Sequence, residues 1–458
     1  MGRYLRFMLL CSVVAALFPS RAVLAQEKEL RLSLSECIDI GLRNNSLVVQ
    51  DRYNVAIAEA GVDDSRNNFL PTSDFSWSMS RSITGPREGS FIEEGTGQVI
   101  TTLTESRVGG SQGVGFGSLS IPVYDAQLNA SLSASKQRLK SVEMDQIANR
   151  QQVVFNVKRD YFNLLQAIKL LEVRKEEIRV AEEDLRRDKT LYEIGSTPIS
   201  NVYSSEANLA GLQAELIQRE NDVEIARTNL SFSLGLGTDV RIVPTEEEFE
   251  VKVPPLTYEE ALDRALEGHP GLLSTKYTML QSRESLKGLQ RSQRYPSVRV
   301  NGGYNWTLGK GERFRGLEDL FLKNYGYSFS VRASLPIFNM RTENSIKQQK
   351  LSYLRSQEQL DQQKRERALL VKQAYLSLER LRRLLEANKA SVRAQEENFK
   401  LAEERYNFGA GTFLERLQAQ RDLFQARNNL VQSIYNYQIE FARLEQAMGG
   451  SVAGPEGE

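Results

Sequence analysis

The chain has 458 residues, with 59 basic and 59 acidic side chains and a formal net charge of +0. This balance offers no basic surface of the kind that binds nucleic acid. Proline is scarce, at 12 residues, and Glu, Lys, Arg, Gln, Leu and Ala are abundant, which is typical of long helices. The composition therefore favours a helical protein and argues against a nucleic-acid-binding one.

The N-terminus has the pattern of a secretory signal peptide at 1–25. Arg3 and Arg6 precede the apolar run FMLLCSVVAALF, and the small residues of AVLAQ predict cleavage after Ala25. Cys11 follows a leucine rather than a small residue, so the pattern does not favour lipid modification. Cleavage leaves Cys37 as the single cysteine and excludes an intrachain disulfide. No later apolar run reaches the roughly 20 residues of a membrane helix.

The rest of the chain contains an internal duplication. LSLSECIDIGLRNNS, from Leu32, is similar to LTYEEALDRALEGHP, from Leu256, and LSIPVYD, from Leu119, is similar to ASLPIFN, from Ala333. We therefore expect two structural repeats, a Pro- and Glu-rich linker between them and a short tail. Their bounds are 26–242 and 257–449 for the repeats, 243–256 for the linker and 450–458 for the tail.

Each repeat carries an apolar residue at every seventh position of one long segment. This period predicts a long helix that supercoils left-handedly against its neighbours. These positions, the apolar ladder, are Val157, Leu164, Leu171, Ile178, Leu185 and Tyr192 in the first repeat and Val371, Leu378, Leu385, Val392, Phe399 and Tyr406 in the second. The core positions between them are mixed in polarity, as expected of a helix in a curved wall that partly faces water.

Two shorter helices accompany each long one. The expected helices are 33–69, 126–193 and 199–235 in the first repeat, and 257–293, 340–408 and 413–449 in the second. A helix of about 68 residues spans roughly 100 Å. Two shorter helices laid end to end match that length, so the fold is expected to be a tall column of helical hairpins rather than a globular core.

Between the first short helix and the long helix, each repeat has a signal for two β-strands. Half-apolar strands of about 10 residues with many aromatics are typical of transmembrane barrels. The candidate lipid-facing residues are Phe75, Trp77, Tyr304, Trp306, Tyr325, Tyr327 and Phe329. The links between paired strands, 84–110 and 309–324, are long and polar, as external loops tend to be.

A soluble β-sandwich edge is the alternative, because alternation marks any half-buried strand. However, four strands cannot bury an apolar face unaided, and the smallest barrel needs about eight. The chain is therefore expected to oligomerise. Three copies of four strands would supply a 12-stranded barrel.

Several motifs recur in a fixed order along both repeats. They are the helical openings at Leu32 and Leu256, Leu70-Pro71 and Tyr295-Pro296 before the strands, LSIPVYD and ASLPIFN after them, Tyr-x-x-Gly at the end of each long helix, and the terminal AQRDLFQARNNLVQSIYNYQIEFARLEQAMG. In this order, over nearly the whole mature chain, they resemble the TolC-type outer-membrane efflux proteins. The resemblance implies a mainly α fold in which long coiled-coil hairpins form an α-barrel, with a smaller 12-stranded β-barrel made by a homotrimer.

The resemblance also implies a function. The chain would be a passive exit duct in the cell outer membrane that extends into the periplasm and serves a tripartite efflux pump or a type I secretion system. Its partners would be a periplasmic adaptor (membrane fusion) protein, an inner-membrane transporter and outer-membrane lipid. The other function considered is a periplasmic coiled-coil structural or adaptor protein without a conduit. The cargo leaves no mark on the sequence, because the inner-membrane partner selects it.

The Tyr-x-x-Gly segments are expected to be the tips where each long helix reverses. Glycine can adopt the left-handed conformation that ends a helix. By resemblance, the tips form the periplasmic gate, with candidate residues Tyr192, Gly195, Asn201, Tyr406, Gly409, Gly411, Glu415 and Gln418. The alternative is that the glycines only terminate helices and the tyrosines only close the apolar ladder.

Glu415 has two possible roles. In a threefold channel it would place three carboxylates around one axis and attract cations. Alternatively, it is a helix-start acid that the helix dipole favours. Asn201, Gly411 and Gln418 stand where relatives often carry charged residues, so this gate is expected to have fewer charged contacts, with Tyr406 as its hydrogen-bonding residue.

The remaining reactive residue types do not form a catalytic pattern. His269, the single histidine, precedes a proline in a helical opening, and Cys37 lies on an apolar helix face. No nucleophile and base are spaced for catalysis. We expect no enzyme activity, no metal and no cofactor.

Overall fold

The computed structural model describes residues 28–93, 95–104, 107–237, 240–245, 256–308 and 325–450. The predicted signal peptide, most of the linker, the link at 309–324 and most of the tail lie outside these ranges. Within them the chain is mostly helical, and it divides into two units. The first, the hairpin unit, comprises Met1–Gln50, Ile147–His269 and Arg367–Glu458, and the second, the sheet unit, comprises Asp51–Gln146 and Pro270–Glu366.

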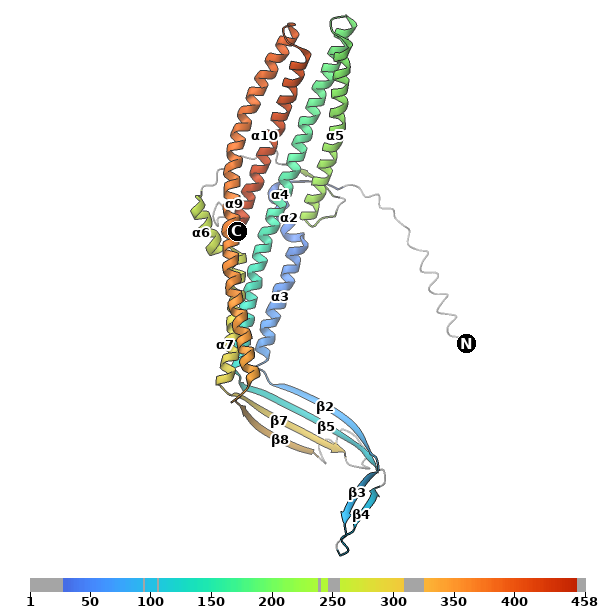
Figure 1. Ribbon diagram of the computed structural model, residues 1–458, viewed down its shortest axis with the longest axis vertical. Coiled ribbons are helices and arrows are strands. Elements are labelled where there is room, and N and C mark those ends of the chain that lie inside the picture. Colours follow the sequence, from blue (N-terminus) through green and yellow to red (C-terminus); the bar gives the residue numbers. More distant parts are fainter. Residues whose placement is uncertain are drawn as a thin grey trace, which may run out of the picture. The chain divides into compact units, whose positions relative to one another are not determined.

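Two helical hairpins build the hairpin unit (Figure 1). In the first, α4 (Ala126–Glu193) turns into α5 (Ile199–Ser233), and in the second, α9 (Met340–Asn407) turns into α10 (Phe413–Met448). The predicted bounds of all four helices agree with these to within two residues. The first parts of α4 and α9 belong to the sheet unit.

The apolar ladder forms the cores of the hairpin unit. Val157 and Leu164 are fully buried in one core, where they pack with α5 and α2 (Leu34–Asn44). Val371 and Leu378 are buried in the other, where they pack with α10 and α6 (Tyr258–Gly268). The seven-residue period therefore predicted the buried face of each long helix.

Polar residues between the ladder positions of α4 are buried as well. Arg159 Nε lies 2.8 Å from Asp160 Oδ1, Ser205 Oγ donates to Asp188 Oδ2 at 2.5 Å, and Arg174 pairs at 2.7 Å with the carboxylate three residues on. We expected these positions to face water in part. They are instead enclosed by protein, and their partners offset the cost of removing charge from water.

The first short helix of each repeat is two helices, so the uninterrupted helices predicted at 33–69 and 257–293 are wrong. The first consists of α2 and α3 (Ser46–Asn67), and the second of α6 and α7 (Pro270–Arg294). Both α2 and α6 begin with a capping box, in which a hydroxyl and a glutamate three residues later bond each other's backbone N–H. The two repeats thus share the start and the break of this helix.

Different residues break the two helices. Asn45 has an extended backbone, and its Oδ1 accepts a hydrogen bond from Leu47 N at 2.9 Å, while its Nδ2 donates to Ser233 O at 2.9 Å. His269 precedes Pro270, and a proline disfavours the helical conformation at the residue before it. A side-chain amide in one repeat and a proline in the other therefore interrupt the helix at equivalent positions, where Asn45 and His269 both have extended backbones.

A short parallel sheet in the hairpin unit was not predicted. It pairs β1 (Lys28–Leu32) with β6 (Val240–Pro244), from the two ends of the first repeat. Ile242 is fully buried in the same core as Leu32. Segments of five residues are too short for a clear alternation signal.

The sheet unit contains a four-stranded antiparallel sheet, in agreement with the four predicted strands (Figure 1). The order is β2-β5-β7-β8, and the bounds are Thr72–Thr84 for β2, Arg107–Tyr124 for β5, Ser297–Leu308 for β7 and Tyr325–Ser334 for β8. The predicted loop at 84–110 also contains a hairpin of β3 (Arg87–Ile92) and β4 (Val99–Thr104), so that expectation is wrong in part. None of the helices in the described ranges combines the length and apolarity needed to cross a lipid bilayer.

Candidate functional site

The strand register places all the predicted lipid-facing aromatics on one face of the sheet. Residues directly opposite each other in an antiparallel sheet share a face. Tyr304 of β7 lies opposite Tyr327 of β8 on one side and opposite Gly117 of β5 on the other. Gly117 in turn lies opposite Phe75 of β2, so all four residues form one row across the sheet. The same reasoning for Trp306 and its row gives an aromatic face made of Phe75, Trp77, Tyr304, Trp306, Tyr325, Tyr327 and Phe329.

Exposure divides these aromatics into two groups. Phe329 is 82% exposed, Tyr327 69% and Phe75 66%, whereas Trp306 is only 3% exposed. Trp306 is therefore on the predicted face but does not belong to the set that presents its ring outward. A glycine, Gly115, lies opposite it on β5, and a position without a side chain leaves room for a large ring to fold against the sheet.

The opposite face of the sheet is mostly small and polar, with Phe116 as an exposed aromatic exception. Ser118, Gly303 and Ser328 form one row across three strands, and a Cβ on Gly303 would lie only 2.5 Å from Ser328 Oγ. In the next row, Ser120 Oγ donates to Asn301 Oδ1 at 3.1 Å. The sheet is thus amphiphilic, with an aromatic face and a hydroxyl-rich face.

The second candidate site consists of the two hairpin tips. Gly195 and Gly409 both have left-handed backbones, with φ of +74° and +70°. After each, the chain closes a Schellman turn: Ser196 N donates to Leu191 O, and Ala410 N donates to Arg405 O, both at 2.8 Å. The predicted tip turns are therefore present in both repeats, with the same hydrogen bonds.

The returning helix at the second tip starts with a capping box. Thr412 N donates to Glu415 Oε2 at 3.1 Å, and Glu415 N donates to Thr412 Oγ1 at 3.2 Å. Of the two roles considered for Glu415, the helix-start role therefore has direct contacts. Gly411 is held close to the turn, because a Cβ there would lie 3.1 Å from Tyr406 N. A larger residue at this position would crowd the tip.

The other polar candidates bond within their own helical segments. Gln418 Nε2 donates to Asp422 Oδ1 at 2.8 Å, and Asn201 N donates to Pro198 O at 3.1 Å. Neither contact joins the two hairpins.

The two tip tyrosines have different surroundings. Tyr192 is 44% exposed, whereas Tyr406 is half-buried and its ring lies against Phe413, with 6.4 Å between centroids. The guanidinium carbons of Arg416 and Arg187 lie 5.2 and 5.7 Å from the centre of the Tyr406 ring. Its buried hydroxyl has no hydrogen-bond partner among the described residues. Within the described residues the Tyr406 ring therefore makes cation–π contacts, and the predicted hydrogen bond of its hydroxyl stays a prediction.

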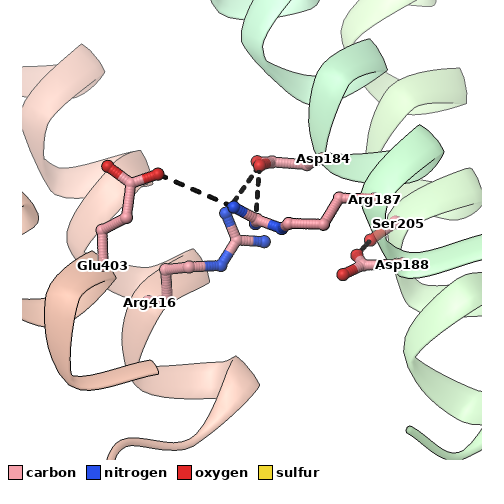
Figure 2. A network of polar contacts seen from close by, with 6 residues as sticks. All are labelled: Asp184, Arg187, Asp188, Ser205, Glu403 and Arg416. Carbon is pink, nitrogen blue, oxygen red and sulfur yellow. Dashed lines mark hydrogen bonds and ion pairs between the residues drawn. The ribbon is translucent and has the colours of Figure 1, made fainter. Parts of the chain in front are cut away.

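Sequence reasoning missed a buried ion pair near the tips. Arg416 is completely buried, and its Nη1 donates to Asp184 Oδ1 at 2.7 Å. Arg187 Nη2 bonds the same oxygen at 2.8 Å, and its Nη1 lies 3.7 Å from Glu403 Oε1. Figure 2 shows these four residues, the tip network, joining α4 of the first hairpin to α9 and α10 of the second.

The tip network is strongly charged but incompletely bonded. Nε and Nη2 of Arg416 and Nε of Arg187 are buried without a partner among the described residues. Next to the network on α4, Oδ2 of Asp188 accepts a hydrogen bond from Ser205. Its other carboxylate oxygen, Oδ1, is buried without a hydrogen-bond partner among the described residues. A buried charge is costly when its partner is lost, at about 3–5 kcal/mol. The network therefore holds the hairpins together only while both partners stay in place.

Only a weak sequence signal pointed to these residues. Asp184, Arg187 and Asp188 place three charges on one face of α4, at spacings of three and four residues, and such a face is usually solvated. Among the residues that the structure describes, no His, Cys, Asp and Glu side chains are grouped so as to hold a metal ion.

Comparison with known proteins agrees with this architecture. The Outer membrane efflux protein family matches residues 38–236 and 261–450. Outer membrane protein TolC of Vibrio cholerae is 21% identical over 85% of this chain and 84% of its own length. Outer membrane efflux protein BepC of Brucella suis is 21% identical over 96% of this chain and 90% of its own length.

A solved structure of CusC shares the fold, with a TM-score of 0.75 and 19% identity over 92% of this chain and 93% of that chain. The family match covers most of the chain, in two parts separated by residues 237–260. The chain therefore belongs to the outer membrane efflux protein family.

Proposed function

We propose that the chain is the outer-membrane exit duct of a tripartite efflux pump or a type I secretion system, a passive conduit through which cargo leaves the cell. The observation that carries the proposal is an amphiphilic sheet with an exposed aromatic face, in a chain that also builds two long helical hairpins. The alternative, a periplasmic coiled-coil tether, gives no reason for such a face, because exposed apolar patches mark contact with a partner or a membrane.

The open edges of the sheet support a homotrimer with a 12-stranded β-barrel. The order β2-β5-β7-β8 leaves the outer edges of β2 and β8 without a neighbour in the described chain. In lipid, unpaired backbone N–H and C=O groups are prohibitively costly. All three strand pairs are antiparallel, so β8 of one copy has the right direction to pair with β2 of the next. The aromatic face would then meet lipid, and the hydroxyl-rich face would line water.

For the periplasmic end, we propose that the tip network holds the duct closed. It is the buried ionic contact between the two hairpins near their tips, and it lies beside Tyr406. Separation of the hairpins must break the Arg416–Asp184 pair, so opening has an energetic cost that a docked partner would have to supply. The candidate residues at the turns, from Tyr192 to Gln418, would set the shape of the tips around it.

The partner at the tips would be a periplasmic adaptor that in turn binds an inner-membrane transporter. Both tips carry exposed apolar side chains: Ile194 is 71% exposed, Phe408 87% and Leu414 68%. Exposed apolar residues at the ends of two hairpins fit a protein partner better than water.

The proposal is tested by placing a charge on each face of β8. Phe329→Lys introduces a cation on the aromatic face, where a lysine at the bilayer midplane costs about 2–4 kcal/mol. Ser330→Lys is the matched control, because the next residue of a strand points to the opposite face. We expect Phe329→Lys to reduce heat-modifiable trimers in isolated outer membranes, and Ser330→Lys to leave them unchanged.

Equal assembly of the two variants would contradict a lipid-facing role for the aromatic face. Recovery of the unaltered protein as a soluble periplasmic species would contradict the duct itself.

A further inference from the structure

The internal duplication extends to the register in which the strands pair. Aligning the proline before β2 with the proline before β7 carries Phe75 to Val300. Aligning LSIPVYD, at the end of β5, with ASLPIFN, at the end of β8, carries Gly117 to Val331. Phe75 lies opposite Gly117, and Val300 lies opposite Val331. The strand pair of each repeat therefore has the same register, and the agreement holds along the whole β7–β8 pairing.

A further strand pairing joins the two repeats to each other. The second strand of the first repeat, β5, pairs with the first strand of the second repeat, β7, and we call this contact the internal seam. The strands equivalent to β5 and β7 are β8 and β2, at the two edges of the sheet (Figure 1). Neither edge has a neighbour on its outer side in the described chain. The two edges are therefore the two halves of a second contact of the same kind.

The partner of these edges is a second copy of the chain. Strand β8 cannot close onto β2 of its own sheet, because the smallest barrels have about eight strands. We propose that β8 of one copy pairs with β2 of the next in the register of the internal seam. The proposal rests on the trimeric duct proposed above, and it adds the alignment of the two strands that join the copies, the outer seam.

The aligned repeats give the rows of the outer seam. In the internal seam, Leu119, Ser120 and Ile121 lie opposite Gly302, Asn301 and Val300. The equivalent rows of the outer seam are Ala333, Ser334 and Leu335 of one copy opposite Trp77, Ser76 and Phe75 of the next.

The faces of the sheet agree with this register. Ser334 and Ser76 both lie on the hydroxyl-rich face, and the residues of the other two rows lie on the aromatic face. A slip of one residue would place each serine opposite a residue of the aromatic face, and such a slip is disfavoured wherever the two faces differ. A slip of two residues would keep the faces together, so the duplication alone selects between these two registers.

An ion pair of the internal seam points to a side-chain contact in the outer seam. Asp125, just before α4, accepts a hydrogen bond from Gln127 N at 2.9 Å through Oδ1, and its Oδ2 lies 3.6 Å from Arg299 Nη2. Asn339 has the equivalent place before α9, and its Oδ1 accepts a hydrogen bond from Arg341 N at 3.0 Å. In each residue one oxygen bonds the first turn of the helix, which leaves the second polar atom for another partner.

In the outer seam, Asp74 of the next copy takes the place of Arg299. Neither the Asp74 carboxylate nor Nδ2 of Asn339 has a hydrogen-bond partner in the part of the chain that the structure describes. An amide N–H and a carboxylate are complementary, as a guanidinium and a carboxylate are. Nδ2 of Asn339 therefore donates to the Asp74 carboxylate of the next copy, and the contact keeps its place with donor and acceptor exchanged.

Disulfide trapping of trimers in isolated outer membranes tests the register. In a Cys37→Ala background, Ser334→Cys with Ser76→Cys puts two thiols directly opposite each other, with Cβ atoms about 4.5–5.5 Å apart. Oxidation should then link most chains covalently to their neighbours. Ser334→Cys with Ser78→Cys is the matched control, because this pair meets only after a slip of two residues. Its Cβ atoms are diagonal neighbours, about 7–8 Å apart, and it should cross-link about tenfold less.

The register and the duct can fail separately in this experiment. Trimers in which the control pair links as well as the first pair, or in which neither pair links, would overturn the register and leave the duct standing. The absence of trimers from the outer membrane in the unaltered protein would contradict the duct and the outer seam together.

A charge exchange tests the contact between Asn339 and Asp74. Asn339→Asp keeps an oxygen for the first turn of α9, since aspartate and asparagine are equally good there, but it sets two carboxylates against each other across the outer seam. The trimers should therefore dissociate at a lower temperature in a gel-shift assay. Adding Asp74→Arg copies the internal ion pair into the outer seam and should restore the dissociation temperature. If the double variant dissociates no later than Asn339→Asp alone, the two side chains do not meet.

Discussion

The two hairpin tips have the same turn but different supports. Gly195 and Gly409 make matching left-handed turns with matching hydrogen bonds. The returning helix α5 then starts at Pro198 without a side-chain cap, whereas α10 starts with a full capping box. Tyr192 is exposed and its counterpart Tyr406 packs among arginine side chains. The duplication has kept the backbone of the turn and changed the side chains that anchor it.

The long helices differ in the same way. In α4, Asp160 and Asp188 are buried between the ladder positions, whereas the equivalent positions of α9 include Ala374, which is buried and apolar. The apolar ladder itself is shared. Both aspartates bond within the first hairpin, Asp160 to Arg159 and Asp188 to Ser205. Asp184 of the same helix instead bonds Arg416 of the second hairpin, so at that position the copies have become complementary rather than remaining equal.

The largest expected effect comes from breaking that complementarity. Asp184→Leu leaves the Arg416 guanidinium buried without its carboxylate, at a cost of about 3–5 kcal/mol. We expect a large rise in single-channel conductance of trimers in planar bilayers, as the hairpins separate. The double variant Asp184→Leu, Arg416→Leu leaves no buried charge. It should therefore recover much of the lost stability of the hairpin contact and conduct less than Asp184→Leu alone.

Arg186→Ala, at an exposed neighbouring position, is the control and should behave as the unaltered protein. If Asp184→Leu conducts as the unaltered protein does, the tip network does not hold the hairpins.

The second prediction concerns the two helix breaks, where His269 in one repeat stands in the place of Asn45 in the other. Burial, and then the nearby Arg367, lower the pKa of His269 from 6.5 to about 4. The unfolded chain therefore binds a proton between these pH values that the folded chain does not, and stability must fall as the pH drops from 6.5 towards 4. The full shift corresponds to roughly 3 kcal/mol.

His269→Asn replaces the titrating ring with the residue type found in the first repeat. Thermal unfolding followed by circular dichroism should lose most of its dependence on pH in this window. An unchanged pH profile in the variant would assign the dependence to other groups.

The third prediction compares a tip glycine with a helical one. Gly409→Ala places a Cβ on a left-handed backbone, at a cost of about 1–2 kcal/mol, although nothing lies within 4 Å of the added atom. Gly211→Ala, in the interior of α5 and equally uncrowded, should stabilise the protein by about 1 kcal/mol. The two melting temperatures should move in opposite directions, and a shift of both in the same direction would contradict a purely conformational role for Gly409.

The smallest effect is expected at Glu415. If the carboxylates of three copies surround one axis, Glu415→Gln should shift the reversal potential of trimers towards lower cation preference. Glutamine still accepts a hydrogen bond from the cap, so stability should change by only a few tenths of a kcal/mol. An unchanged reversal potential would leave Glu415 with its capping role alone.

The sequence predicted local features well and distant pairings poorly. The ends of α4 and α10 followed from the seven-residue period and from the turn and cap residues, which act within a few positions. The Arg416–Asp184 pair joins residues 232 positions apart, and nothing in either segment indicates the other. The β1–β6 pairing was not predicted either, because its two strands are also far apart in the sequence. Trp306 was placed on the correct face, but its burial depends on neighbours from other strands, which alternation along one strand does not reveal.

The outer edges of β2 and β8, which have no neighbouring strand among the described residues, also bear on how the protein is made. A lone chain that entered lipid would carry two rows of unsatisfied backbone groups with it, and this penalty disappears only when the last neighbour arrives. In the proposed trimer, insertion and the recruitment of the other subunits would therefore happen as one event, and the yield of finished ducts should depend steeply on how many chains are delivered together. A low supply of newly made chains would therefore reduce the assembly of such an oligomer more than the assembly of a barrel closed by a single chain.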